Sequence, residues 1–414
     1  MLTIVNLKVK LIDKVRVLKE VRGVKIMKEN STLLPNNKQD QKKIKTFKNL
    51  ITEVHEKNLC GSCGGCVSFC SAHEISAIEM GEDGIPHFCN EDNCLECGIC
   101  YFICPEVRVV DDELRHQWNW KPPIGNFDDI LVAQATDPKI REKATDGGVV
   151  TALLHYMLDH KFIDGAIVSK KTGNPFEREP IIATNLQDLL GAAGSGFSDM
   201  AHVKELGKYT TYSPSLYALR DLKKADLARI AVVGTPCQIH TIRKMQVLKI
   251  LPSHIVKYAI GLYCMENFSF GQEEREQFEK RIGINLNDVA KMNMLEDLVF
   301  TMKDGTVTHV SFDDVETLVR PACIACTDFA NDFADISVGG LGSPEGFTTS
   351  ILRTDAGTKM FKGAVEAGYI KVRSVKNWNV ERTKTLASVI NFAEKKRQRG
   401  LDRLRELLNE TGDL

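Results

Sequence analysis

Eight of the thirteen cysteines in this sequence fall in two short runs that share one spacing. Residues 60–70 read CGSCGGCVSFC and residues 94–104 read CLECGICYFIC, so the second run repeats the first at a period of 34 residues. In paired runs of this kind, the three CxxCxxC cysteines ligate one iron–sulfur cubane and the fourth cysteine ligates the other. The sequence therefore predicts two [4Fe-4S] clusters: one held by Cys60, Cys63, Cys66 and Cys104, and one held by Cys94, Cys97, Cys100 and Cys70.

Two zinc knuckles would also use eight cysteines, but zinc sites give no reason for the doubled spacing. Four glycines lie inside the two runs: Gly61, Gly64, Gly65 and Gly98. They favour the clusters, because a residue without a Cβ lets backbone amides approach the inorganic sulfides. The segment resembles bacterial two-cluster ferredoxins, although Ser71 stands where these usually have a proline, as Pro105 does after the second run. Cys89 lies outside both runs and is interpreted as a small buried hydrophobic residue.

The composition indicates a globular protein with a large core. The chain has 414 residues, of which 43% are hydrophobic and 26% charged, enough for two or more domains. Its net charge of −1 gives no electrostatic reason to expect binding to nucleic acid or to an anionic membrane. No apolar run reaches the roughly 18 residues that span a bilayer, and lysines interrupt the opening residues, which excludes a signal peptide. We therefore expect a cytoplasmic protein, in which thiols stay reduced and serve metal ligation rather than disulfides.

The expected fold combines α+β and α/β parts in five regions. They are an N-terminal extension that is flexible (1–50), a ferredoxin-like 2[4Fe-4S] domain (51–112), a linker (113–126), a larger mixed α/β flavin-binding domain (127–360) and a C-terminal helical region (361–414). The extension is lysine-rich and polar, and Met27 is an alternative first residue. Short equivalent strands are expected after each cysteine run, in ISAIEM (75–80) and VRVVDD (107–112). The C-terminal helix is expected to begin near Glu381 and to break at Gly400.

Strands and helices alternate over the larger domain. Residues 147–159, GGVVTALLHYMLD, have apolar residues at helical spacing. Buried strands are expected at FIDGAIVSK (162–170), LARIAVVG (227–234) and IVKYAIGLYC (255–264). Four more cysteines lie in this part of the chain: Cys237, Cys264, Cys323 and Cys326. Two of them follow predicted strands, where an α/β sheet presents functional residues, but spacing alone leaves both metal ligation and core packing open.

The surrounding motifs are similar to those of the family of coenzyme F420 hydrogenase/dehydrogenase beta subunits. In order, they are ATDGGVVTALL, GKYTTYSP, GTPCQIHTIRK, GLYCMENF, CIACTDF and ADISVGGLGSPEGFTTSILRT. This resemblance implies a flavoprotein that binds FAD beside a third [4Fe-4S] cluster, with coenzyme F420 as substrate. The implied ligands of the third cluster are Cys237, Cys264, Cys323 and Cys326. The deazaflavin of F420 carries a hydride and each cluster carries one electron, so FAD between them is the necessary converter.

The flavin site is expected at the start of the helix over residues 147–159. No GxGxxG or GxxxxGK motif occurs, but Gly147 and Gly148 open this helix, whose N-terminal amides suit a pyrophosphate, and Thr151 faces the same end. Asp146 stands where the family usually has Ser or Cys and is interpreted as the N-cap. The resemblance adds further pocket residues: Lys208, Tyr209, Thr235, Glu266, Asn267 and Arg353. Lys208, Glu266 and Asn267 are the catalytic candidates, and Lys208 is the best candidate for a charge on the flavin ring or a phosphate.

Several functions fit these motifs. The leading hypothesis is an input subunit that oxidises reduced F420, because ferredoxin clusters ahead of the flavin domain resemble the F420 dehydrogenase module. The alternatives are a subunit that reduces F420 with electrons from hydrogen or formate, a reductase of the same superfamily with another substrate, and a simple electron-transfer ferredoxin. The implied partners are subunits of F420 dehydrogenase, hydrogenase, formate dehydrogenase or heterodisulfide reductase complexes, of the kind found in methanogenic archaea.

Overall fold

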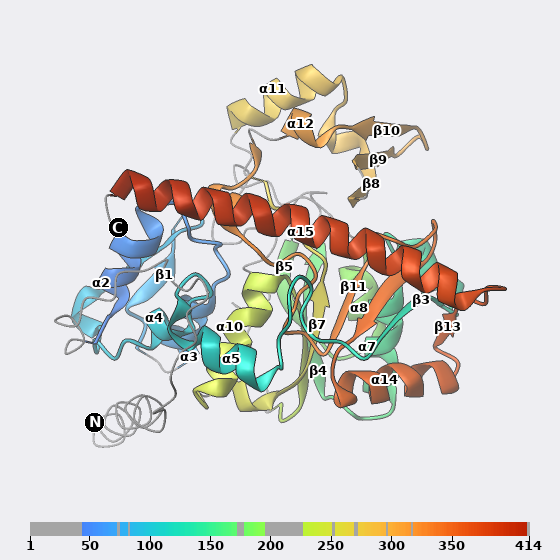
Figure 1. Cartoon of the computed structure of the whole chain (residues 1–414), viewed down its shortest axis with the longest axis horizontal. Helices are drawn as coiled ribbons and strands as arrows, with labels where there is room; N and C mark the ends of the chain where they lie inside the picture. The colour runs from blue at the N-terminus through green and yellow to red at the C-terminus, as the bar shows by residue number, and fades with distance from the viewer. Residues whose placement is uncertain are drawn as a thin grey trace.

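The computed structural model describes nine segments of the chain, which are residues 44–72, 75–81, 83–171, 178–194, 227–250, 253–268, 272–294, 297–315 and 318–411. Figure 1 shows a cysteine-rich module beside a larger domain built on one sheet, and a long C-terminal helix that runs along the molecule. Most of the predicted N-terminal extension, residues 1–43, lies outside the described residues. Among the described residues, no helix has the length and apolar character needed to cross a membrane.

Short helices and one hairpin surround the two cysteine runs. These elements are α2 (Phe47–Leu50), a π-helical turn (Ile51–His55), α3 (Gly65–Ala72), β1 (Ile78–Met80), β2 (Pro86–Phe88), a 3-10 turn (Glu91–Asn93), α4 (Ile99–Ile103), a 3-10 turn (Arg108–Val110) and α5 (Asp111–Gln117). Phe47 and Leu50 are buried in the small core of this module, so its packing begins before residue 51. The region is consistent with a ferredoxin module.

Only the first of the two expected equivalent strands forms. β1 forms within ISAIEM, but its partner is β2, and the residues after the second cysteine run form a 3-10 turn that leads into α5. Three acidic residues begin α5, which suits the positive end of a helix dipole. Asp111 also forms an ion pair at 2.7 Å with Lys244 of a neighbouring helix. These local and tertiary contacts outweigh the β propensity of the valines.

An eight-stranded mixed sheet forms the centre of the larger domain, in the order β13-β3-β12-β11-β7-β6-β4-β5. The strands are β3 (Asp129–Ala135), β4 (Gly165–Lys171), β5 (Arg178–Ala183), β6 (Ile230–Gly234), β7 (Val256–Leu262), β11 (Ile336–Gly339), β12 (Thr348–Leu352) and β13 (Ile370–Val372). The four middle strands β11, β7, β6 and β4 are parallel, and the flanking pairs are antiparallel. The three predicted strands are confirmed as β4, β6 and β7. The sheet also extends past residue 360, because β13 pairs with β3.

Helices cover both faces of the sheet. They are α6 (Pro138–Lys143), α7 (Val149–Asp159), α8 (Leu186–Ala192), α10 (Pro236–Val247) and α14 (Asp355–Glu366). A 3-10 turn spans Ser253–Ile255, and α13 (Pro321–Ala325) packs against the C-terminal helix. Successive residues of a strand point to opposite faces. Accordingly, Ala166 and Val168 of β4 pack with α7 and α14, whereas Ile167 packs with α10. Phe69 and Ile99 join the α10 cluster, which places the cysteine-rich module on that side, as Figure 1 shows.

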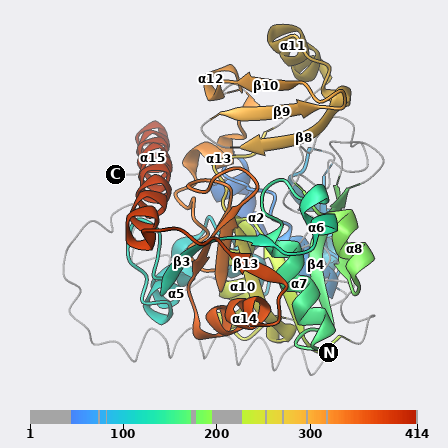
Figure 2. The ribbon, with the colours of Figure 1, turned by 90° about the vertical axis from the view of Figure 1, so that its right-hand side faces the viewer.

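A small subdomain is inserted between β7 and β11. It contains α11 (Gln272–Ile282), a 3-10 turn (Leu286–Asp288), β8 (Val289–Met294), β9 (Leu298–Met302), β10 (Val307–Val310) and α12 (Phe312–Val315). Its three strands form an antiparallel sheet with a hydrophobic core of its own. Figure 2 shows that it stands apart from the large sheet, above α13.

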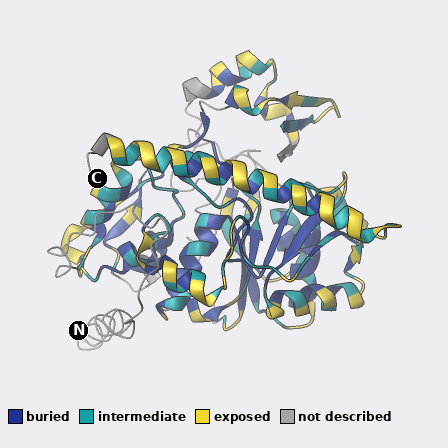
Figure 3. Ribbon diagram, viewed as in Figure 1, coloured by how far each residue is buried: buried dark blue, intermediate teal, exposed yellow. Residues whose placement is uncertain are grey.

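The C-terminal helix α15 (Trp378–Thr411) is continuous, so the predicted break at Gly400 is wrong. A Cβ at Gly400 would lie only 2.6 Å from the carbonyl oxygen of Cys326. The glycine therefore allows close packing against the segment that carries Cys326 and does not end the helix. Figure 3 shows buried residues along one side of α15 and exposed residues along the other.

Candidate iron–sulfur and flavin site

The fold brings the eight cysteines of the two runs close together. Burial raises the pKa of the Cys66 thiol, and the next causes are other thiolates. These neighbours are Cys63, Cys60, Cys100 and Cys104. For the pKa of Cys100, which burial also raises, the neighbouring thiolates are Cys97, Cys94 and Cys70. We call Cys60, Cys63, Cys66 and Cys104 the first set, and Cys70, Cys94, Cys97 and Cys100 the second set.

The internal repeat extends to the backbone conformation. Ser62 and Glu96, which occupy equivalent positions, have φ of 50° and 48°. Gly64 and Gly98, also equivalent, have φ of 77° and 74°. Each run thus turns through the left-handed region twice, and the second position is one where glycine is strongly favoured. Two copies of one turn therefore present two equivalent groups of thiols.

The donor sets fit clusters better than single metal ions. Thiolates around one zinc ion all lie about 2.3 Å from it. In a cubane each thiolate binds a different iron atom, so the four sulfurs surround a volume and do not converge on one point. The amide of Ala77, 3.3 Å from the Cys70 sulfur, adds the kind of donor that cluster thiolates accept.

The third group of cysteines comes from three separate elements. Cys237 is the second residue of α10, Cys264 follows β7, and Cys323 and Cys326 lie in and just after α13. Burial raises the pKa of Cys237, and the thiolates of Cys63, Cys264 and Cys326 raise it further. Burial likewise raises the pKa of Cys264 to about 12, with Cys323 and Cys326 as contributing neighbours. The structure therefore brings together the four cysteines that the family resemblance implied, which we call the third set.

α10 lies between the third set and the first set. One turn after Cys237 along α10, the Thr241 hydroxyl lies 3.5 Å from the Cys63 sulfur. One turn further on, Lys244 donates a hydrogen bond of 2.8 Å to the carbonyl oxygen of Cys104. A Cβ at Gly65 would lie 2.3 Å from the Thr241 methyl group, so a glycine is required for this close contact. The single helix α10 therefore carries Cys237 of the third set and contacts Cys63 and Cys104 of the first set.

A cavity of about 290 Å³ opens beside the third set. Its walls come from the start of α7, the carboxyl ends of β6 and β7, and the loop after β11. The residues that line the cavity include Asp146, Gly148, Thr151, Arg178, Thr235, Gln238, Tyr263, Cys264, Glu266, Gly340 and Phe392. This is the edge at which parallel α/β sheets bind their ligands.

Two buried polar atoms in this cavity have no hydrogen-bond partner among the residues that the structure describes: the amide nitrogen of Gln238 and the hydroxyl of Tyr263. Buried donors of this kind are costly unless a ligand satisfies them. The start of α7 adds the backbone amides of a helix N-terminus and the positive end of its dipole, and the remaining walls combine apolar and polar residues. These features fit a flavin dinucleotide, whose ring is planar and whose pyrophosphate is anionic.

Several predicted pocket residues reach the cavity. Gly148 (φ 73°) is the N-cap of α7, and Thr151 lies in its first turn. The interpretation of Asp146 as the N-cap is wrong, because the N-cap is Gly148, two residues later, and Asp146 lies against Gly340 in the cavity wall. Thr235 caps α10, and its hydroxyl lies 3.3 Å from the Cys237 sulfur.

Glu266 is buried in the cavity wall and pairs with Arg399 of α15 at 2.6 Å. Asn267, the next residue, does not line the cavity; its side-chain oxygen accepts a hydrogen bond from the amide of Phe268. Of these two catalytic candidates, Glu266 alone lies in the cavity wall. Lys208 and Tyr209 lie outside the described residues.

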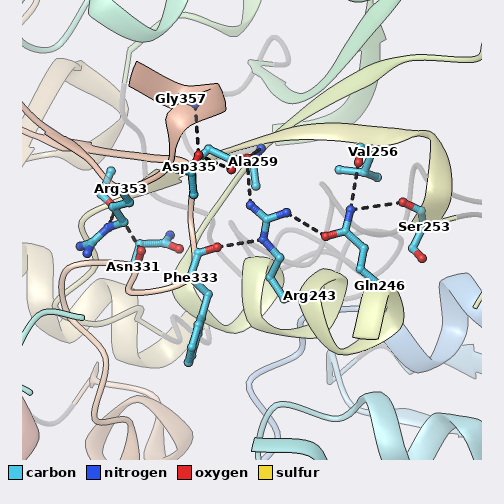
Figure 4. Close-up of polar contacts among 12 residues, drawn as sticks. Arg243, Gln246, Ser253, Val256, Ala259, Asn331, Phe333, Asp335, Arg353 and Gly357 are labelled. Carbon is cyan, nitrogen blue, oxygen red and sulfur yellow. Dashed lines mark hydrogen bonds and ion pairs between the residues drawn. The ribbon is translucent and has the colours of Figure 1, made fainter. Parts of the chain in front are cut away.

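Gly147 and Arg353 do not line the cavity. The amide and carbonyl of Gly147 are bonded to Thr348 and Ala135 in the sheet. The guanidinium of Arg353 donates to the hydroxyl of Ser337 and to backbone carbonyls of Ile124, Asn126 and Ala330. Figure 4 shows it in a buried polar network with Asp335 and Arg243. This arrangement favours a structural role for Arg353 over the predicted flavin contact.

Sequence reasoning missed other residues of the site. Gln238 and Tyr263 each adjoin a third-set cysteine, so the motifs TPCQ and LYC contained a signal for them. Arg178 and Phe392 had no such signal, because they reach the cavity from β5 and α15. The interpretation of Cys89 as a buried residue is also wrong, since its side chain is exposed and donates to the carbonyl of Ser76.

Comparisons with known proteins agree with this geometry. Residues 130–207 and 227–377 match the models of the N-terminal and C-terminal parts of the coenzyme F420 hydrogenase/dehydrogenase beta subunit. The chain belongs to this family. It is therefore an F420-type oxidoreductase subunit, and membership implies flavin and iron–sulfur cofactors.

Three relatives match this chain over most of their own length. The coenzyme F420 hydrogenase subunit beta of Methanococcus voltae is 34% identical over 61% of this chain and 86% of its own. An F(420)H(2) dehydrogenase subunit of Methanosarcina mazei is 29% identical over 75% of this chain and 84% of its own. A chain of the F420-reducing [NiFe] hydrogenase complex from Methanosarcina barkeri superposes with a TM-score of 0.57 at 28% identity, over 67% of this chain and 93% of that one.

Proposed function

We propose that this chain oxidises reduced coenzyme F420 and delivers the electrons singly to a partner subunit through three [4Fe-4S] clusters. One observation carries the proposal: the cavity that fits a flavin is lined by Cys264, a member of the third set. A hydride site and a one-electron site thus share a wall. FAD, when bound, supplies the conversion between the two kinds of transfer.

Each wall of the cavity has a separate role. The start of α7, with Gly148 and Thr151, binds the pyrophosphate through backbone amides and the helix dipole. Gln238 and Tyr263 donate hydrogen bonds to the polar edge of the ring and fix its orientation. The ion pair with Arg399 holds the Glu266 carboxylate in one position, on the side of the cavity where F420 would bind. These contacts position the hydride donor and acceptor and exclude water, and hydride transfer needs no general base.

The arrangement of the cysteine sets supports one order of electron carriers. Cys237 of the third set neighbours Cys63 of the first set, through the α10 contact. Cys66 of the first set neighbours Cys100 of the second set. Electrons would therefore pass from the third cluster to the first and then to the second. Leu95, between two ligands of the second set, is 40% exposed, so the electron exit lies there.

The oxidising direction is supported by the ferredoxin module. The match to the dehydrogenase subunit of Methanosarcina mazei extends over 75% of this chain, against 61% for the hydrogenase beta subunit of Methanococcus voltae. An F420 dehydrogenase complex is accordingly the leading partner. The reverse direction, reduction of F420 in a hydrogenase or formate dehydrogenase complex, uses the same residues and is supported by the higher identity of 34%.

Anaerobic mixing with reduced F420 tests the proposal. The flavin absorbance should bleach first, the cluster absorbance should follow, and a one-electron dye added as acceptor should be reduced with turnover. Mixing with NADH in place of reduced F420 is the matched control and should give neither change. A purified chain without a flavin spectrum, or a flavin that reduced F420 leaves oxidised, would refute the proposal.

A further inference from the structure

One face of α15 is built against the third set. Phe392 lines the cavity, Lys396 and Arg399 donate hydrogen bonds to the backbone of Cys264 and Cys323, and Gly400 packs on Cys326. These four positions are three or four residues apart or adjacent, so they share a face of the helix. The family match ends at residue 377, immediately before α15 begins at Trp378. α15 therefore follows the matched segment directly and reaches its redox site.

Lys396 is the most unusual residue on this face. Its side chain is fully buried, and its Nζ lies 2.6 Å from the carbonyl oxygen of Cys264. A buried ammonium group is unfavourable unless negative groups compensate it. The hydrogen-bond partner of this ammonium group is the backbone of a third-set cysteine, and an anionic cluster held by that set would supply the compensating charge.

We propose that Lys396 raises the reduction potential of the third cluster. It acts as a positioning residue, because its buried ammonium group holds a fixed positive charge beside the cluster. Reduction adds one electron, donated by the flavin, to the cluster; no covalent bond forms or breaks. A cation held beside the cluster in a low-dielectric site stabilises the more negative, reduced state, which raises the potential. This inference rests on the proposed function, because it requires that the third set hold a cluster.

Potentiometric titration followed by electron paramagnetic resonance tests this role in the full chain. The third-cluster signal is identified as the one missing from Cys326→Ser. Lys396→Met keeps the length and apolar stem but removes the charge, and should lower the equilibrium constant for reduction about tenfold or more, which is about 59 mV for one electron. Lys396→Arg keeps the charge and should stay within about threefold of the unsubstituted chain. Lys395→Met, at the adjacent exposed position, is the matched control and should have no effect.

The outcomes separate charge from packing. An unchanged third-cluster potential in Lys396→Met overturns the proposal. If Lys396→Met assembles only two clusters, full iron content in Lys396→Arg supports the role of the charge, whereas loss in both variants overturns it. An equal shift of all three clusters also overturns it, because the effect would then not be local. Absence of the third signal from the unsubstituted chain would instead show that the proposed function has failed.

Discussion

Replacing Gly400 with alanine tests whether α15 is fitted to the third set. Alanine in a helix interior is ordinarily favoured over glycine by about 1 kcal/mol. Here the new Cβ would lie 2.6 Å from the carbonyl oxygen of Cys326 and 3.0 Å from that of Ala325. Both atoms are backbone and cannot rotate away, and overpacking of this kind costs about 1–3 kcal/mol. We therefore expect a net destabilisation of up to about 2 kcal/mol and weaker retention of the third cluster, since Cys326 is displaced.

Gly191→Ala provides the matched control for this substitution. Gly191 lies in α8, and its nearest neighbour would be the Lys170 side chain at 3.5 Å, an ordinary contact. This substitution should stabilise the chain by about 0.5–1 kcal/mol. Urea unfolding followed by circular dichroism measures both effects, and iron analysis of anaerobically purified protein measures cluster retention. If Gly400→Ala were as stable as Gly191→Ala with full iron content, the close packing of α15 on the third set would be refuted.

Four further predictions concern the cofactors and the α10 interface. Anaerobically purified protein should contain about twelve iron and twelve sulfide per chain, and Cys326→Ser about eight; zinc without sulfide would contradict the scheme. Cys237→Ala should leave the flavin reducible by reduced F420 but slow electron delivery to a one-electron dye, and loss of flavin reduction with the flavin retained would contradict the order of carriers. Lys244→Met removes the buried partner of Asp111 and should lower the free energy of unfolding by about 3–5 kcal/mol, while exposed Lys249→Met should leave it unchanged. His240 and Lys244 overcome the effect of burial and hold the pKa of Asp111 below its ordinary value, so its contribution to stability should be present above pH of about 3.9 and be lost as the pH falls further; Asp111→Asn should flatten this part of the acid unfolding curve.

Much of the metal chemistry could be predicted from the sequence. The ligands of the first and second sets are recognisable because cluster ligation imposes a short, fixed spacing along the chain, and the repeat at 34 residues shows it twice. The buried strands β4, β6 and β7 were equally recognisable, because a parallel strand covered on both faces is a continuous apolar run. The third set depended on family motifs, since Cys237, Cys264 and Cys323 come from three elements and have no common spacing.

Other features lay beyond sequence reasoning because their causes are long-range contacts. Arg353 carries a charge that suits a phosphate, yet the fold surrounds it with carbonyl oxygens of distant segments. The valines after the second run favour a strand, but they form a 3-10 turn that leads into α5, where Val110 and Asp111 contact α10. In both cases the residue type is compatible with two roles, and only its neighbours select one.

The C-terminal helix α15 has features that its sequence predicts and others that depend on contacts with distant segments. Its sequence predicts a helix, because apolar residues recur at helical spacing, and glycine suggests an end. Its contribution to the third set depends on Lys396 reaching Cys264 across 132 residues and on Gly400 fitting against Cys326. The sequence by itself determined the internal repeat of the cysteine runs and the principal strands, because these follow from local spacing and periodicity. Only the tertiary structure decided which charges and which glycine face the cysteines, because burial and close packing depend on segments that are distant in the chain.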